Sequence, residues 1–284
     1  MTQFHFISGL PRSGSTLLAA ILRQNPAIHA SMASPVGALF NGMLRNMSGH
    51  NEASLFIDDD MREDMLKGLF KTFYARAPEI VFDSNRMWPA KIHTLLDLFP
   101  EARFIACVRE PAWVVDSIEK LLRTNAYEVS GIFGFEPGGN VFSRAAGLMQ
   151  SPNGLVGGSL DNLREGYYSA LAEGRMWLVE YEALVREPRV VISAIYDWLK
   201  IPRFIHDFNH VTQIPGAAEF DRRLHTTGLH TVGAKVEWRE RETVLPAELF
   251  NSLPKPFWRV APNPKVPVVH FDREDHERKL RCVS

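Results

Sequence analysis

Cysteine is scarce in this sequence of 284 residues, which contains only Cys107 and Cys282. Two cysteines far apart in the chain exclude a disulfide framework and a cysteine-based metal site, and they are typical of a reducing compartment. Cys107 lies in the apolar run of residues 104–108, so we expect it to be a small buried hydrophobe. Cys282 lies in a polar tail.

An excess of charge of one sign is also missing. The chain has 32 Lys and Arg residues against 33 Asp and Glu residues, a formal net charge of −1. This balance argues against a general nucleic-acid binder or a membrane-surface protein, because both usually carry a marked basic excess. No stretch is long and apolar enough to span a bilayer, and the N-terminus does not resemble a signal peptide. We therefore expect a cytoplasmic, soluble protein with no nucleic-acid partner.

Apolar strand-like segments alternate with amphipathic helical segments over the first two hundred residues. We expect strands at residues 4–10, 79–83, 103–108 and 176–180, and helices at residues 15–22, 61–77, 89–98, 111–123, 160–172 and 188–199. This alternation predicts an α/β fold in which helices flank a central parallel β-sheet.

Two segments lack the regular spacing of apolar residues that marks a helix or a strand. Residues 130–159 are rich in Gly, Pro, Ser and Asn, and we expect them to form a long irregular loop. The C-terminal segment contains many prolines and short strand-like pieces. With no repeat and no linker in view, we expect one domain over residues 1–284, with a core at 1–202 and an irregular part at 203–284 packed on it.

The most informative motif lies between the first expected strand and the first expected helix. It reads Gly9-Leu10-Pro11-Arg12-Ser13-Gly14-Ser15-Thr16. A turn here exposes backbone N–H groups at a helix N-terminus, where hydrogen bonds and the helix dipole stabilise a bound phosphate. Ser13, Ser15 and Thr16 add hydroxyl donors, and Arg12 adds a planar guanidinium group suited to oxyanions. The motif predicts a phosphate-binding loop.

The spacing of this loop matches the ATP- and GTP-binding pattern G-x-x-x-x-G-K-[ST] at every position but one. Ser15 stands where that pattern has its lysine. Phosphoryl transfer relies on this lysine and on Mg²⁺ to offset the triphosphate charge. A phosphotransferase (kinase) with a degenerate loop, in which Asp83 would hold the Mg²⁺, is the alternative function, and a non-catalytic nucleotide-binding domain is a third.

Residues 11–18 resemble the 5′-phosphosulfate loop of sulfotransferases that use 3′-phosphoadenosine-5′-phosphosulfate (PAPS), in particular tyrosylprotein-type and many bacterial members. The resemblance implies a P-loop-like sulfotransferase fold. It also implies that PAPS is the co-substrate, that adenosine-3′,5′-bisphosphate (PAP) is the product, and that no metal takes part. The acceptor would be a hydroxyl group of a peptide, a carbohydrate or a small molecule, with a peptide tyrosine as one candidate.

Further residues carry the same resemblance. In the family, an arginine that leaves the third strand and a serine eight positions later hold the 3′-phosphate, and Arg109 and Ser117 reproduce both. Tyr181 stands where family members have a tyrosine that contacts the adenine. The Arg-Lys-Gly segment of cytosolic members is absent, and we expect Lys235 to supply the corresponding cation.

The catalytic residues are less clearly marked. Sulfuryl transfer needs a base for the acceptor proton and positive charge for the developing oxyanions. Arg12 is the first candidate for this charge, and Arg86 is the second, near the place where family members have a catalytic lysine. The catalytic base of tyrosylprotein-type members and that of cytosolic members are both missing from the corresponding positions of this chain. Three local candidates remain: His29, Asp83 and Glu136.

Overall fold

A seven-stranded sheet forms the centre of the computed structural model, which describes residues 2–49, 52–137, 139–271 and 280–283. The strand order is β2-β3-β1-β4-β5-β6-β7. Neighbours from β2 to β6 are parallel, and β7 is antiparallel to β6. The strands are β1 (Gln3–Gly9), β2 (Ile28–Ala30), β3 (Ile80–Ser84), β4 (Phe104–Val108), β5 (Met176–Glu180), β6 (Val268–Phe271) and β7 (Leu280–Val283).

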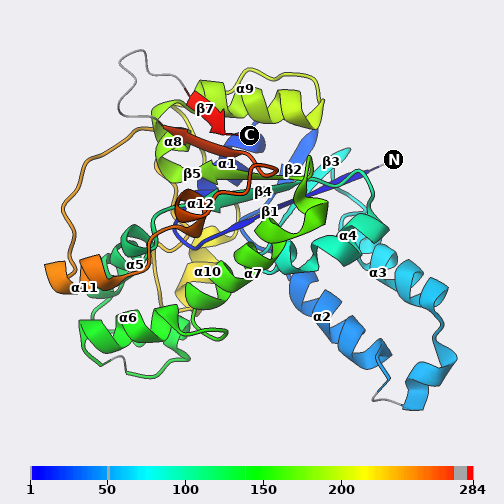
Figure 1. The fold of residues 1–284 in the computed structure, drawn as a ribbon, viewed down its shortest axis with the longest axis horizontal. Helices are drawn as coiled ribbons and strands as arrows, with labels where there is room; N and C mark the ends of the chain where they lie inside the picture. The colour runs from blue at the N-terminus through cyan, green and yellow to red at the C-terminus, as the bar shows by residue number, and fades with distance from the viewer. Residues whose placement is uncertain (1, 50–51, 138, 272–279, 284) are drawn as a thin grey trace.

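Helices cover both faces of this sheet (Figure 1). The α-helices are α1 (Ser15–Leu22), α2 (Val36–Met47), α3 (Asp59–Phe73), α4 (Ile92–Leu98), α5 (Pro111–Thr124), α6 (Val141–Met149), α7 (Gly157–Tyr168), α8 (Tyr181–Arg186), α9 (Pro188–Leu199), α10 (Ala217–Arg223), α11 (Ala247–Ser252) and α12 (Phe257–Val260). Short 3₁₀ helices are η1 (Glu52–Phe56), η2 (Trp88–Lys91), η3 (Gly131–Phe133) and η4 (Ala170–Ala172). The predicted α/β fold with a flanked parallel sheet is confirmed.

The hydrophobic core is divided by the sheet into two clusters. Along β4, Phe104 and Ala106 pack with α2 to α7, whereas Ile105 and Cys107 pack with α1, α8 and α9. Successive side chains of a strand point to opposite faces, so a strand that is apolar throughout requires cover on both sides. Cys107 is fully buried, as expected, and burial raises the pKa of its thiol to about 12.

The prediction of an irregular loop over residues 130–159 is wrong. This segment contains η3, the whole of α6 and the start of α7. Helix α6 begins after Asn140, whose side chain accepts hydrogen bonds from the backbone N–H groups of Phe142 and Ser143. Its Ala145 and Leu148 are buried in the core. Packing and an N-cap stabilise a helix here despite a composition that is typical of loops.

The C-terminal part, expected to be irregular, contains α10 to α12 and adds β6 and β7 to the sheet. It contacts the core through buried polar groups. The indole N–H of Trp258 donates to Glu180 over 3.0 Å, and Asp116 on α5 accepts from the Thr243 hydroxyl over 2.8 Å and from the Val244 amide over 2.7 Å. The two bonds to Asp116 hold Thr243 and Val244 against α5.

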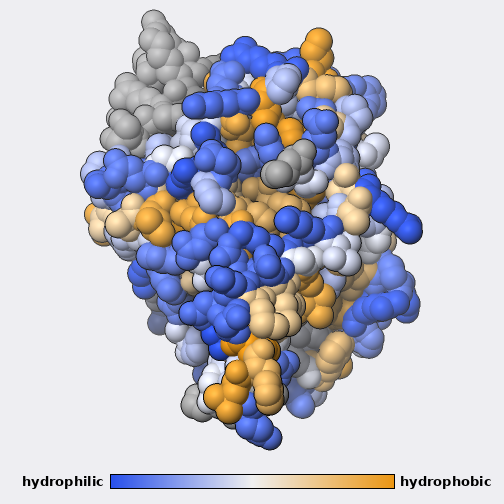
Figure 2. Space-filling view, turned by 90° about the vertical axis from the view of Figure 1, so that its right-hand side faces the viewer, coloured by the Kyte–Doolittle hydropathy of each residue, from blue (hydrophilic) through white to orange (hydrophobic). Residues whose placement is uncertain are grey.

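Helices α2 and α3 extend from the body as an arm (Figure 1). Apolar side chains are exposed along this arm, among them Leu55, Phe56 and Phe73, and the face drawn in Figure 2 shows apolar residues at its lower end. In the part of the chain that the structure describes, no helix has the length and apolar character needed to cross a membrane.

Candidate active site

A cavity of about 830 Å³ opens at the carboxyl ends of β1, β3 and β4. Ligands of open α/β sheets bind at this edge, where loops and helix N-termini converge. The residues predicted from sequence that line it are Pro11, Arg12, Gly14, Ser15, Thr16, Arg86, Arg109, Ser117, Tyr181 and Lys235. The structure therefore brings together most of the expected site.

The phosphate loop is held in a conformation that only some residues accept. Gly9 has a φ of 114°, and a side chain at this position would overlap the carbonyl oxygen of Cys107. Gly14, with a φ of 97°, precedes α1, and a Cβ there would lie 3.1 Å from the Tyr181 ring. The Ser13 hydroxyl is buried within hydrogen-bonding distance of the carbonyl oxygens of Leu10 and Cys107, and it can donate its one proton to either of them. Its side chain therefore stabilises the loop and does not face the cavity.

Arginine side chains gather on one side of the loop. Arg12 Nε lies 3.2 Å from Ser117 Oγ, and the Arg109 guanidinium lies over the Tyr181 ring, 4.6 Å from its centroid. Arg241 reaches the same wall and bonds to Asp116 at 2.5 Å. Burial, followed by the nearby charge of Arg241, lowers the pKa of Arg109 to about 10.

Part of this positive charge has no protein partner. Within the described ranges, Arg109 has no hydrogen bond or ion pair, and the buried Nε of Arg241 has no acceptor. Buried donors without partners are costly, and several like charges close together repel each other. A bound polyanion would satisfy both conditions, so this wall has the chemistry of a phosphate site.

Arg86 and Lys235 line other parts of the cavity. Arg86 follows β3, and no ion pair or hydrogen bond ties its guanidinium to any residue that the structure describes. Desolvation within the concave site lowers its pKa. Lys235 is exposed and forms an ion pair with Glu237 at 3.5 Å. Both cations can contact a ligand in the cavity.

The three residues predicted as candidate bases, His29, Asp83 and Glu136, lie outside the cavity lining. Asp83 is fully buried and accepts hydrogen bonds from Ser34, Tyr74 and Trp88 at 2.6–2.7 Å. Burial raises its pKa. His29 lies on β2 with its ring against that of Tyr74, at a centroid distance of 5.2 Å. Neither these two residues nor the exposed Glu136 lines the cavity.

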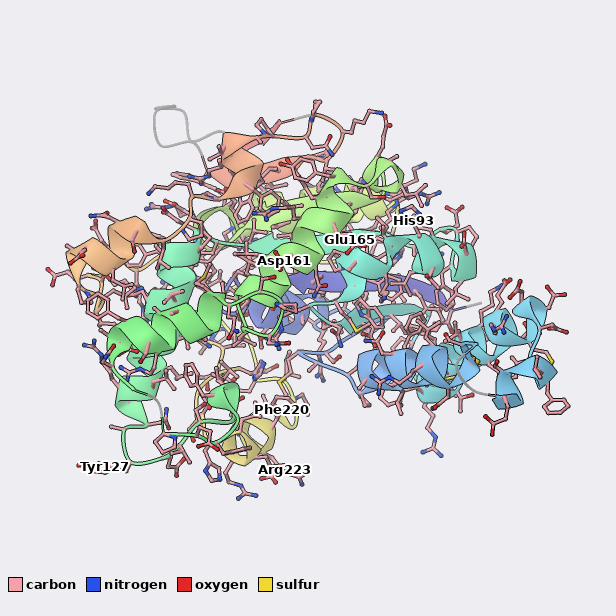
Figure 3. The ribbon with its side chains drawn as sticks, turned by 60° about the horizontal axis from the view of Figure 1, so that its bottom comes forward. His93, Tyr127, Asp161, Glu165, Phe220 and Arg223 are labelled. Carbon is pink, nitrogen blue, oxygen red and sulfur yellow. The ribbon has the colours of Figure 1, made fainter. Side chains whose placement is uncertain are left out.

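Sequence reasoning missed residues that the C-terminal part adds to the site. His230 and Arg241 line the cavity, and His230 Nδ1 lies 2.6 Å from an oxygen of the buried Asp221. Asp221 is on α10, where Figure 3 labels Phe220 and Arg223. Their spacing along the chain matches no motif, so only the folded structure brings them to the loop.

Comparison with known protein families shows which family the chain belongs to. A sequence profile described as "Sulfotransferase family" matches residues 5–206, more than two thirds of the chain. The chain belongs to the sulfotransferase family. The match contains the phosphate loop, Arg109, Ser117 and Tyr181, and it ends close to residue 202, where the expected core ends. The closer likeness of the loop to tyrosylprotein-type members stays a prediction.

Two solved sulfotransferase structures are similar to this chain. The sulfotransferase domain from the curacin biosynthetic pathway is 21% identical, with a TM-score of 0.48 over 72% of this chain and 76% of that one. The sulfotransferase from Alicyclobacillus acidocaldarius is 17% identical, with a TM-score of 0.47 over 78% of this chain and 89% of that one. The search of curated proteins found no match.

Proposed function

We propose that this sulfotransferase uses PAPS as its donor and transfers the sulfuryl group to an acceptor hydroxyl. One observation carries the proposal: the partly unpaired guanidinium groups and Ser117 form one wall of the cavity that contains the phosphate loop. PAPS has two separate anionic groups on one nucleoside, the 5′-phosphosulfate and the 3′-phosphate. A loop and a second cationic site in one cavity suit such a ligand.

Each part of PAPS has a suitable set of residues. The N-terminus of α1, with Ser15 and Thr16, would hold the 5′-phosphosulfate through backbone N–H groups and hydroxyls. Arg109 and Ser117 would hold the 3′-phosphate, and the Tyr181 ring would contact the adenine. PAPS supplies an activated sulfuryl group, and Arg86 would offset negative charge that develops during transfer.

The kinase alternative is less well supported by the same residues. Ser15 cannot replace the phosphate-binding lysine, because a neutral hydroxyl does not offset triphosphate charge. The Asp83 carboxylate, which would have to hold Mg²⁺, is occupied by three donors in the core. Among the described residues, no group of three or more His, Cys, Asp or Glu side chains is arranged to hold a metal ion.

The cellular setting is part of the proposal. The balanced charge supports an acceptor other than nucleic acid, and the low cysteine content supports a cytoplasmic location. The acceptor hydroxyl would belong to a peptide, a carbohydrate or a small molecule, with a peptide tyrosine as one candidate.

Calorimetric titration with PAP and with 5′-AMP tests the 3′-phosphate site. Arg109→Ala and Ser117→Ala should each weaken PAP binding by about 10- to 100-fold, since a hydrogen bond to a charged group contributes about 1.5–3 kcal/mol. Binding of 5′-AMP, which lacks the 3′-phosphate, should change little.

Arg103→Ala is the matched control. Arg103 precedes β4, at the opposite end of the strand from Arg109, and its guanidinium also lies over an aromatic ring, that of Trp198 at 5.1 Å. It does not line the cavity, so its loss should leave both affinities unchanged. Equal losses for PAP and 5′-AMP in the Arg109 and Ser117 variants would reject the assignment.

A further inference from the structure

His230 and Asp221 form a hydrogen-bonded pair at the edge of the cavity. The Asp221 carboxylate is buried and accepts two bonds from the same residue: Oδ1 lies 2.6 Å from His230 Nδ1, and Oδ2 lies 2.8 Å from the His230 backbone nitrogen. The Phe220 ring packs edge-on against the imidazole, with a centroid distance of 5.3 Å. Three contacts therefore fix the position and orientation of one histidine ring.

This geometry determines which ring nitrogen is available. An ionised carboxylate only accepts hydrogen bonds, so Nδ1 must carry the proton that it donates to Asp221. The second nitrogen, Nε2, then has a free lone pair. His230 lines the cavity, and among the residues described here none is hydrogen-bonded to Nε2. A lone pair directed by a buried carboxylate and open to a reaction site is the arrangement of a general base.

The charges around His230 come from three elements. Asp221 of α10 favours the protonated ring, whereas Arg86 after β3 and Arg12 of the phosphate loop disfavour it. Burial is the largest influence, and together these effects lower the pKa of His230 below its usual 6.5. A lowered pKa favours the neutral form of the imidazole, which can accept a proton.

Other proton acceptors in the cavity are less suited to this role. Glu237 lines it but pairs with Arg239 and Lys235, and Arg239 lowers the pKa of its carboxyl group. A carboxylate with two cationic partners is a weak base. His29, Asp83 and Glu136 do not line the cavity. Among the described side chains that line the cavity, His230 combines a lowered pKa with a free lone pair.

We propose that His230 is the catalytic base of the transfer and that Asp221 is its positioning residue. The inference rests on the proposed use of PAPS. His230 Nε2 takes the proton of the acceptor hydroxyl as the acceptor oxygen bonds to sulfur. The bond between sulfur and the 5′-phosphate oxygen breaks, and its electron pair stays on that oxygen. Arg12 and Arg86, which lie near His230, would offset the negative charge.

His230→Asn tests the base directly. An asparagine amide can still donate to Asp221 from near the place of Nδ1, but it has no group equivalent to Nε2. Conversion of PAPS into PAP, with water as the acceptor, should fall by about 100-fold or more. PAP affinity by calorimetry should stay within about threefold, because the anion sites are untouched.

His210→Asn is the matched control. His210 Nδ1 lies 2.8 Å from Asp207, so the same pairing is present, but the imidazole is exposed and does not line the cavity. This variant should keep full turnover. Turnover of His230→Asn within about threefold of the wild-type value would overturn the assignment, as would a loss explained by weaker PAP binding.

The pH profile separates a base from a structural histidine. A lowered pKa places the acid limb of kcat/KM below pH 6.5, and this limb should disappear in His230→Asn. In Asp221→Asn the limb should move to lower pH, because the carboxylate that favours protonation is gone. An NMR titration of the His230 imidazole in the PAP complex should show the same shift. An unchanged titration in Asp221→Asn would contradict the role of Asp221.

Calorimetry on the wild-type protein tests the proposed use of PAPS separately from the role of His230. If wild-type protein does not distinguish PAP from 5′-AMP in calorimetry, the proposed use of PAPS is rejected, and the reaction assigned to His230 is rejected with it. If PAP binds as expected and His230→Asn still turns over PAPS, only the base assignment is wrong.

Discussion

Arg12 has surroundings that differ from those of the other cavity arginines. Among the described residues, Arg109 and Arg86 have no hydrogen-bond or ion-pair partner, whereas Arg12 contacts Ser117 and donates from Nη1 to the carbonyls of Gly228 and Leu229. The residue after Leu229 is His230. From sequence, Arg12 was expected to act mainly on the transferring group. Its contacts indicate that it also joins the phosphate loop to Ser117 on α5 and to the segment that contains the proposed base.

Arg12→Ala should therefore lower both kcat and PAP affinity. We expect kcat for PAPS turnover to fall by about 100-fold, by analogy with the loss of one oxyanion donor, and PAP affinity to fall by about tenfold. Arg12→Lys should restore only part of either, because the planar guanidinium that bonds to several acceptors is lost. Single-turnover rates at saturating PAPS, with calorimetric affinities, separate the two effects. Unchanged affinity with low kcat would restrict Arg12 to the transfer step.

At the scale of elements, Gly9 decides how closely β1 approaches β4. Any side chain at Gly9 would overlap the Cys107 carbonyl, and its φ of 114° lies in a region that favours glycine. Gly9→Ala should lower the free energy of unfolding by several kcal/mol, since strand pairing must be disrupted. Gly174→Ala is the control: its φ is 68°, but nothing lies within 4 Å of the new methyl group. It should cost about 1 kcal/mol.

Urea denaturation of both variants checks this prediction. If Gly9→Ala and Gly174→Ala lower the free energy of unfolding by similar amounts, the conformational preference of glycine determines the cost at Gly9. The close approach of β1 to β4 would then not be the cause.

The elements that sequence predicted well are those with a strong local signal. The first helix was expected over residues 15–22 and is observed as Ser15–Leu22, and the four core strands differ from expectation by at most a residue or two. Helix α2 was not predicted because Gly37 and Gly42 weaken its local preference, and burial of Phe40 stabilises it instead. Tertiary packing thus stabilises helices such as α2 that the local sequence pattern does not predict.

In the site, too, residues with a strong local signal could be predicted from sequence, whereas residues placed by long-range contacts could not. The phosphate loop and Arg109 follow strands directly, so their positions at the carboxyl edge could be predicted from the chain alone. His230 and Arg241 come from the C-terminal part, which reaches the cavity through contacts far apart in sequence. Asp83 looked suitable at the end of β3, but three donors bind its carboxylate in the core.

At the scale of the whole molecule, we propose that residues 1–284 fold as one domain. The support is the buried Asp116 of α5, which bonds to Arg241, Thr243 and Val244 of the C-terminal part. Pairing of β6 with β5 adds the same part to the sheet. A shared sheet and shared buried polar groups couple the two parts in one cooperative unit.

Asp116→Ala should destabilise the whole molecule, by about 3–5 kcal/mol, because Arg241 loses its partner in a partly buried site. Asp197→Ala, which removes the exposed partner of Arg203, should change stability far less, because solvent screens an exposed ion pair. Unfolding followed by tryptophan fluorescence and by circular dichroism should give one coincident transition in the wild-type protein. Two separate transitions would contradict a single domain.

The most direct test of the central claim is a competition between donors. Protein is incubated with ³⁵S-labelled PAPS, with ATP labelled at the γ-phosphate and Mg²⁺, and with a mixture of phenolic, carbohydrate and peptide hydroxyl acceptors. Because the loop lacks the lysine of ATP-dependent enzymes and the wall with Arg109 and Ser117 suits a 3′-phosphate, ³⁵S should be transferred and the γ-phosphate should stay on ATP. Transfer of the γ-phosphate with PAPS left intact would contradict the account.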